Sequence, residues 1–255
     1  MANKERYKQP VPPDAVRVWR GIKAMGTSNA EFRDKIGHIF IPTAVQTQAP
    51  LGMTAYLPTV LPASKPKKVP DEIALVFYES QATYTRTSVT TSGRAYSLLH
   101  GALFSLAASK SGFPVKLGRN LAADTPYFLF PNAADWSGGQ CRLLVGTPRS
   151  NHPPAKLRRS AYRVLKTLQR RRPKGLDGGI VVASNSYFLY WEHWRDRIGK
   201  GAVEVLARML KPVIIVKPRA ATVATNGFAS YAGLTIGKNG AALNLQFDRH
   251  ALRLR

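Results

Sequence analysis

Residues 154 to 174 read PAKLRRSAYRVLKTLQRRRPK, and this is the most informative stretch of the 255-residue chain. Apolar side chains recur in it at helical spacing and form a narrow seam: Leu157, Ala161, Val164, Leu165 and Leu168. Pro153 and Pro154 mark its start, and Pro173 with Gly175 marks its end. The pattern predicts an amphipathic helix over residues 155–172.

The remaining surface of this helix is cationic, and the segment contains no acidic residue. The charge is carried by Arg158, Arg159, Arg163, Lys166, Arg170, Arg171 and Arg172. Like charges at neighbouring helical positions repel each other by roughly 0.3 kcal/mol, so a partner outside the helix is expected to compensate them. A polyphosphate backbone is the partner that this pattern favours, and a solvated basic face is the alternative.

The whole chain is basic, with 38 Lys and Arg against 14 Asp and Glu and a formal charge of +24. Such a surface attracts polyanions from a distance. A membrane is the less favoured partner because the apolar runs are too short to span a bilayer and no signal-peptide pattern opens the chain. Cys141 is the only cysteine, so we expect no internal disulfide, a small core residue and a cytoplasmic location.

Hydrophobic residues make up 44% of the chain, which suits one large or two small globular domains. Residues 1–72 are basic and rich in proline and are predicted to form an N-terminal region, followed by an α+β region over residues 73–255. In the second region short apolar runs alternate with amphipathic stretches, in the order strand, helix, strand, strand, helix, strand. This order predicts an α+β fold of ferredoxin-like, RRM-like modules.

Several local signals refine this picture. Ser28 followed by Glu31 has the form of a capping box and predicts a short helix. Residues 42–72 contain six prolines and are expected to be a long connection with short extended pieces. Residues 80–108 are expected to form a helix that starts at a serine cap. Residues 14–25 suit either a strand or a helix.

Few patterns in the chain fit a metal or nucleotide site. It lacks a G-x-x-x-x-G-K-[ST] run and any Cys-x-x-Cys or His-x-x-x-His spacing, so neither a metal nor another cofactor is expected. The closest cluster is Glu192, His193 and Asp196, whose acids are expected to pair with the adjacent arginines.

Metal-free cleavage of RNA needs only a base, an acid and a cation for the phosphate. His38 lies just after Arg33 and Lys35, whose charges favour a neutral imidazole, so His38 is the candidate general base. His100 lies among leucines within the predicted helix and is expected to be a packed core residue.

Two further features suit RNA. The aromatic side chains of Tyr187, Tyr190, Trp191 and Trp194 lie next to arginines, and unstacked bases bind on such platforms; strand residues packed in a core are the alternative. A glycine-rich loop over residues 233–240 contains Gly233, Gly237, Lys238 and Gly240. It suits either a close approach to phosphates or a hairpin turn.

The basic helix, the α+β order, the glycine-rich loop before a closing strand and the N-terminal histidine together resemble the CRISPR repeat-cleaving endoribonucleases, most closely the type IV variant. The resemblance implies two ferredoxin-like folds with an inserted arginine-rich helical projection. It also implies metal-independent cleavage beside a repeat hairpin and retention with other subunits in a ribonucleoprotein. The projection would present Arg158, Arg159, Arg163, Arg170 and Arg171 to the RNA stem, and the loop would contribute Gly233, Gly237 and Gly240.

The sequence therefore predicts an endoribonuclease that processes a structured precursor RNA by attack of the 2′-hydroxyl and stays bound to the guide-RNA product. The alternative is a non-catalytic RNA- or DNA-binding protein, associated with ribosomes or encoded on a plasmid. A DNA-binding regulator is a third possibility, disfavoured because no helix-turn-helix accompanies the basic helix.

Overall fold

The computed structural model describes residues 10–48, 51–136, 139–217 and 221–222. The first part of the chain forms η1 (Pro13–Ala15), β1 (Val16–Gly21), α1 (Asn29–Lys35), η2 (Ile36–Phe40), α2 (Ile41–Gln48), β2 (Met53–Val60), β3 (Glu72–Tyr78), α3 (Gln81–Ser88), α4 (Thr91–Leu103) and β4 (Lys110–Gly112). The second part forms β5 (Val115–Lys116), β6 (Pro126–Phe128), β7 (Gln140–Pro148), α5 (Pro154–Arg171), β8 (Leu176–Ala183), β9 (Phe188–Trp194), α6 (Val203–Arg208), β10 (Leu210–Val216) and β11 (Ala221–Thr222).

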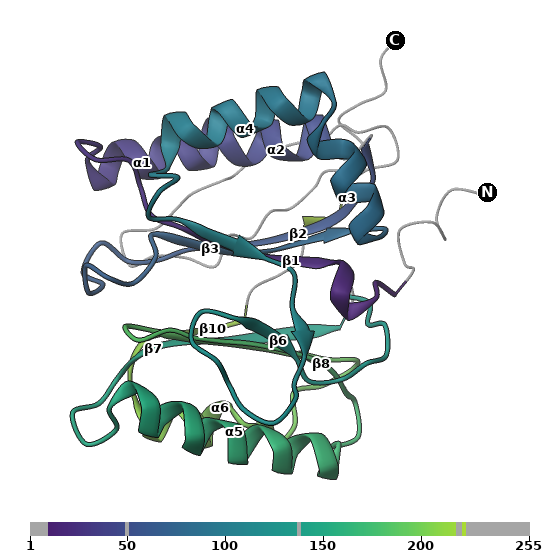
Figure 1. The fold of residues 1–255 in the computed structure, drawn as a ribbon, viewed down its shortest axis with the longest axis vertical. Helices are drawn as coiled ribbons and strands as arrows, with labels where there is room; N and C mark the ends of the chain where they lie inside the picture. The colour runs from purple at the N-terminus through teal and green to yellow at the C-terminus, as the bar shows by residue number, and fades with distance from the viewer. Residues whose placement is uncertain (1–9, 49–50, 137–138, 218–220, 223–255) are drawn as a thin grey trace.

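Two sheets lie face to face, and helices cover the outer side of each (Figure 1). The first sheet has the order β11-β2-β3-β1-β4, and the second has the order β10-β7-β9-β8-β6-β5. Neighbouring strands are antiparallel except that β5 pairs with β6 in parallel. The predicted α+β class is confirmed.

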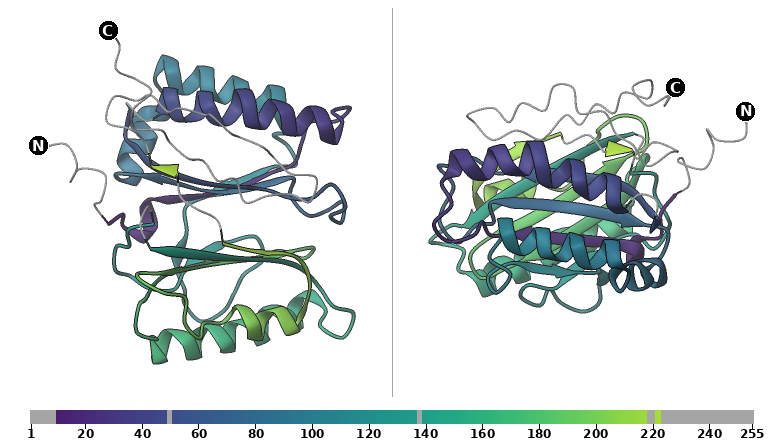
Figure 2. Two further views of the ribbon diagram at one scale, coloured as in Figure 1. Left: turned by 180° about the vertical axis from the view of Figure 1, so that it is seen from behind. Right: turned by 90° about the horizontal axis from the view of Figure 1, so that it is seen from above.

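The helices divide between the two outer faces. The segment α1–η2–α2 runs beside α4 over the first sheet, and α5 with α6 covers the second (Figures 1 and 2). One core lies between the sheets and one lies under each helical layer. Among the described residues, no helix has the length and hydropathy needed to cross a membrane.

The central strands β2 and β3 of the first sheet are largely apolar on both faces because both faces are covered (Figure 1). In β1 the valines Val16 and Val18 pack between the sheets, whereas Arg17 and Trp19 point toward the helices. The segment that the sequence left open is thus a strand from Val16 onward. Its alternation sends polar side chains into the layer beneath the helices, where the cavity described below lies.

Residues 80–108 form two helices instead of the one expected. Ser80 caps α3 as predicted, by accepting a hydrogen bond from the Thr83 amide. Thr90 then caps α4 by accepting from the Gly93 amide at 3.0 Å. A Cβ atom at Gly93 would lie 2.1 Å from the Thr87 carbonyl oxygen, so the sharp junction requires a glycine there.

The proline-rich segment 42–72 is more regular than a connection. It contains most of α2 and all of β2, a central strand whose residues are nearly all buried. The boundary predicted after residue 72 falls at the first residue of β3, which pairs with β2 in one sheet. The predicted capping box at Ser28 is present, since its hydroxyl accepts from the Glu31 amide.

The predicted basic helix is present as α5, but it does not project from the protein. Leu157, Ala161, Leu165 and Leu168 pack into the core under the second sheet, and the helix lies along that face (Figure 1). The exposed cations of this region are Lys156, Arg159, Arg163, Arg170, Arg171, Arg172 and Lys174. The amphipathic seam itself explains the correction, because burying it holds the helix flat on the sheet.

Candidate functional site

A cavity of about 250 Å³ lies between the outer face of the first sheet and the helices above it. It is lined by Arg17, Trp19, Phe40, Gln48, Tyr56, Val76, Tyr78, Tyr84, Ser88, Gly93, Tyr96, Ser97, His100, Leu106 and Ser111. An apolar cavity of about 150 Å³ holds benzene, so this one has room for a substituted aromatic ring.

Strand alternation and helical spacing bring these side chains together. Arg17 and Trp19 are two residues apart on β1 and therefore share its outer face. On α4, Tyr96 and His100 are four residues apart and share the face that looks down on the sheet. The cavity thus has a floor of strand residues and a roof of helix residues.

Arg17 is the one cation among the residues that line the cavity. Its Nε donates to the Ser111 hydroxyl at 2.5 Å, and its guanidinium lies 4.1 Å above the centre of the Tyr84 ring. Burial lowers the pKa of Arg17. Arg17 is half-buried, and among the described residues no carboxylate lies within 4.0 Å of its guanidinium, so this partly desolvated charge has no acidic partner there.

His100 is a neutral hydrogen-bond acceptor in this setting. Its Nδ1 lies 2.8 Å from the Tyr96 carbonyl oxygen, and because a carbonyl only accepts, Nδ1 carries the proton. Nε2 is then unprotonated. Trp19, Phe40 and Tyr96 surround the ring edge-on with centroids 4.3–5.0 Å away, and burial lowers the pKa of His100 to about 4.

Tyr56 connects the cavity to a buried carboxyl group. Its hydroxyl donates to Glu72 Oε1 at 2.6 Å, and Glu72 is fully buried. Burial raises the pKa of Glu72 to about 7, although the hydrogen bond from Tyr56 opposes this. Burial also raises the pKa of Tyr78 to about 12, so that phenol stays neutral.

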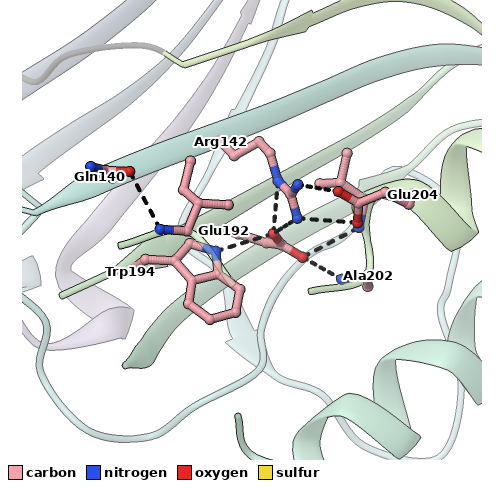
Figure 3. Close-up of polar contacts among 8 residues, drawn as sticks. Gln140, Arg142, Glu192, Trp194, Ala202 and Glu204 are labelled. Carbon is pink, nitrogen blue, oxygen red and sulfur yellow. Dashed lines mark hydrogen bonds and ion pairs between the residues drawn. The ribbon is translucent and has the colours of Figure 1, made fainter. Parts of the chain in front are cut away.

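The second sheet has an arginine in the corresponding position, and there the charge is neutralised (Figure 3). Arg142 on β7 lies opposite Glu192 on β9, and its Nε and Nη2 donate to Glu192 Oε2 at 3.1 and 2.6 Å. Glu204 on α6 also pairs with Arg142. In the first sheet the residue opposite Arg17 is Val76, which has no charge.

The residues predicted to bind and cleave RNA do not meet in the structure. His38 lies in η2 with 65% of its side chain exposed, and Asp34 Oδ1 is 3.7 Å from its Nε2. It therefore faces an acid instead of the two expected cations, and it does not line the cavity. Lys35 pairs with Glu31 at 2.7 Å, and Arg33 is half-buried.

The cationic helix α5 lies on the opposite side of the molecule from α1 and α2 (Figure 1), and His38 belongs to η2, which joins α1 to α2 in the chain. Arg158 donates to Asn185 Oδ1 and Lys166 donates to Gln169 Oε1, both at 2.7 Å. Gly233, Gly237, Lys238 and Gly240 lie outside the described residues.

The aromatic side chains expected to stack on bases belong to the core instead. Tyr187, Tyr190, Trp191 and Trp194 are all at least 94% buried. Glu192 and His193 alternate along β9 and so point to opposite faces: Glu192 pairs with Arg142, and His193 Nδ1 lies 2.5 Å from Asp177 Oδ1. The described residues contain no group of three or more His, Cys, Asp and Glu side chains suited to a metal. Cys141 is buried as predicted.

Sequence reasoning missed Arg17, Tyr56 and Glu72 and assigned His100 to the core. The available signal was the alternation in Val16–Gly21, which places an arginine and a tryptophan on one face of a strand. This alternation is a weak signal for a site, because it does not show whether helices cover that face of the strand or which helices they are.

No protein-family model and no curated protein sequence matches the chain. Similar solved structures include a predicted monooxygenase from Lactobacillus acidophilus, with 7% identity, a TM-score of 0.36 and coverage of 81% of this chain and 97% of that one. One from Fusobacterium nucleatum has 9% identity, a TM-score of 0.39 and coverage of 84% and 97%. An anthrone oxidase-like protein has 8% identity, a TM-score of 0.37 and coverage of 84% and 95%.

The structure corrects the sequence interpretation. The expected relationship to CRISPR endoribonucleases and the RNA-processing function are wrong, because the residues on which they depended are not brought together. The non-catalytic nucleic-acid-binding alternative is equally unsupported. The features that suggested the family were a helix that packs flat, a histidine that faces an acid and a loop outside the described residues.

Proposed function

We propose that this protein binds a small, planar, weakly acidic molecule as its anion in the cavity of the first sheet. The observation that supports this is Arg17, a half-buried cation that lines the cavity and has no carboxylate partner among the described residues. A buried charge is costly unless it is paired, and a ligand anion would complete the pair.

The second sheet provides an internal comparison. Arg142 occupies the matching strand position but is paired with Glu192 and Glu204, an arrangement that serves packing of the outer layer. Replacement of the acid by Val76 in the first sheet leaves Arg17 without that partner. Arg142 is paired with acids, as expected for a structural ion pair. Arg17 has no such partner among the described residues, as expected for a site that binds an anion.

The cavity walls define the rest of the ligand. Phe40, Tyr96 and His100 offer aromatic contacts on which a flat ring can pack edge-on or offset. The neutral Nε2 of His100 accepts a hydrogen bond from a donor on the ligand. Pockets for drug-sized ligands measure about 300–1,000 Å³, so the smaller volume here favours a ligand with one substituted ring or two fused rings.

We further propose that both halves of the chain are ferredoxin-like modules. In the first, β1, β2, β3 and β4 follow one another with helical segments after the first and third strands. In the second, β7, β8, β9 and β10 follow the same plan with α5 and α6. In both, the first strand of the plan lies between the third and the fourth, which supports a common module.

The binding proposal is tested by titrating the protein with benzoate, a flat anion, in a calorimeter. Arg17→Gln removes a charged hydrogen bond worth roughly 1.5–3 kcal/mol, so we expect benzoate to bind at least about tenfold more weakly. The matched control is Arg159→Gln, which removes an equal charge from the exposed face of α5. Absence of benzoate binding to the wild type, or equal weakening by both substitutions, would show that Arg17 is not the anion site.

A further inference from the structure

Glu72 has properties that a structural carboxyl group rarely has. It is fully buried at the start of β3, and its Oε1 accepts a hydrogen bond from Tyr56, which itself lines the cavity. The indole N–H of Trp19 also lies close enough to favour the charged form of Glu72. Among the described residues, no cation lies within 4.0 Å of it, and Oε2 has no hydrogen-bond donor. A carboxyl group in this position stores or accepts a proton more readily than it holds a charge.

Close packing seals Glu72 from solvent on the side of β1. The residue opposite it on that strand is Gly21. A Cβ atom there would lie 2.4 Å from Phe104 Cε1 and 2.7 Å from Trp19 Nε1, so the glycine admits both aromatic rings above the carboxyl group. Trp19 also lines the cavity, but its indole N–H only donates and cannot accept a proton near neutral pH. The Tyr56 hydroxyl, which can both donate and accept, is therefore the group that can relay a proton between the cavity and Glu72.

We propose that Tyr56 and Glu72 together take the proton from a ligand that enters the cavity as a neutral acid, an inference that rests on the ligand class proposed above. The ligand O–H bond breaks as its proton passes to the Tyr56 oxygen, while the Tyr56 proton passes to Glu72 Oε1. The ligand becomes an anion, Glu72 becomes a neutral carboxylic acid, and Tyr56 is unchanged. Tyr56 is the group in contact with the ligand, and Glu72 acts through it.

Charge balance favours this transfer. Before it, the site contains a carboxylate without a cationic partner and an arginine without an anionic one. After the transfer, the negative charge lies on the ligand beside Arg17, and the carboxyl group of Glu72 is neutral. A neutral ligand also loses less hydration on entry than a preformed anion would.

Glu72 is a better proton acceptor than His100 in this cavity. Burial raises the pKa of Glu72 to about 7, whereas burial lowers the pKa of His100 to about 4. The other groups that face Glu72 are Tyr56 from β2, Trp19 from β1 and Tyr96 from α4. Burial and the charge of Glu72 raise the pKa of Tyr96 well above its ordinary value, so neither that phenol nor the indole competes for the proton near neutral pH.

The experiment uses 3-nitrophenol, a weak acid that is largely neutral near neutral pH and whose phenolate absorbs visible light. The wild type is expected to bind it as the phenolate, without net release of a proton to solvent when a pH indicator is present. Infrared difference spectra should show a new carboxylic acid band that disappears in Glu72→Gln. In Glu72→Gln and in Tyr56→Phe, the phenolate band of the bound probe should fall by about tenfold or more.

Glu31→Gln is the matched control, because it removes an exposed carboxyl group and should leave the spectrum as in the wild type. Circular dichroism of each variant establishes that it is folded. If benzoate binds to Arg17 but the phenolate band is equal in the wild type, Glu72→Gln and Tyr56→Phe, the proton relay is refuted and the anion site stands. If benzoate does not bind to the wild type, the proposed function itself fails.

Discussion

Glu72 and His100 lie in the same outer layer of the first sheet, and burial moves their pKa values in opposite directions because it disfavours whichever form is charged. The carboxyl group is raised to about 7 and the imidazole is lowered to about 4. Their effects on stability therefore have opposite signs, and each can be measured in a single substitution.

For Glu72, the pKa rises from 4.5 in the unfolded chain to about 7 in the folded protein. Its contribution to stability is full below about pH 4.5 and is lost as the pH rises through about 7, a change of about 3 kcal/mol. Glu72→Gln removes this dependence. Urea unfolding at about pH 5 and pH 8 should show the variant gaining relative to the wild type at the higher pH, and a constant difference would contradict the assignment.

For His100, the pKa falls from 6.5 in the unfolded chain to about 4 in the folded protein. Its contribution is present above about pH 6.5 and is lost as the pH falls through about 4. The stability difference between the wild type and His100→Asn should therefore shrink on acidification over that window. An unchanged difference would indicate that the imidazole is freely protonated.

Single residues show where sequence reasoning is limited. The capping serines Ser28 and Ser80 were predictable because a cap is a local hydrogen bond between neighbours in the chain. Arg17 and Glu72 were not, because their properties depend on distant segments that desolvate them. Burial depends on the tertiary structure, so the local sequence around a charged strand residue does not show whether water or a helix covers it.

At the scale of elements, the junction between α3 and α4 sets the roof of the cavity. Gly93→Ala would place a Cβ atom 2.1 Å from the Thr87 carbonyl oxygen, so we expect a loss of about 1–3 kcal/mol. Gly101→Ala in the same helix meets only Leu106 Cδ1 at 3.6 Å and should be neutral or gain up to about 1 kcal/mol. Equal effects in thermal unfolding would contradict the tight junction.

The ion pairs of the second sheet give a second contrast between elements. Glu192 is fully buried and accepts from Arg142, Trp194 and the Ala202 amide (Figure 3). Glu192→Gln should cost about 3 kcal/mol or more in urea unfolding because it leaves Arg142 poorly paired. Glu204→Gln should cost about 1 kcal/mol or less because 58% of that side chain is exposed. The reverse order would refute the structural assignment of this network.

Elements also explain two errors of the sequence prediction. Prolines in residues 42–72 suggested a connection, yet Pro58 lies within β2, opposite Ala74 of β3. The amphipathic pattern correctly predicted the helix α5. Its charged face suggested a projecting RNA-binding helix, whereas its apolar face packs against the second sheet. Periodicity predicts that a helix has an apolar face, but it does not predict which sheet that face packs against, because the sheet is formed by other segments of the chain.

For the whole molecule, composition predicted less than the element pattern did. The formal charge of +24 suggested a polyanion as partner, but charge constrains solubility and steering more than fold or active site. The alternation of strands and helices predicted the α+β class correctly because it reflects burial throughout the chain. The proposed function depends on how the surroundings of Arg17 and Arg142 differ, and this difference appears only when the two residues are compared in space.

The most direct test of the account is a crystal structure of the protein grown with benzoate. We predict that the carboxylate lies within hydrogen-bonding distance of the Arg17 guanidinium, with the ring packed among Phe40, Tyr96 and His100. Benzoate found only on the exposed arginines of α5, with the cavity filled by its own side chains, would contradict the central claim.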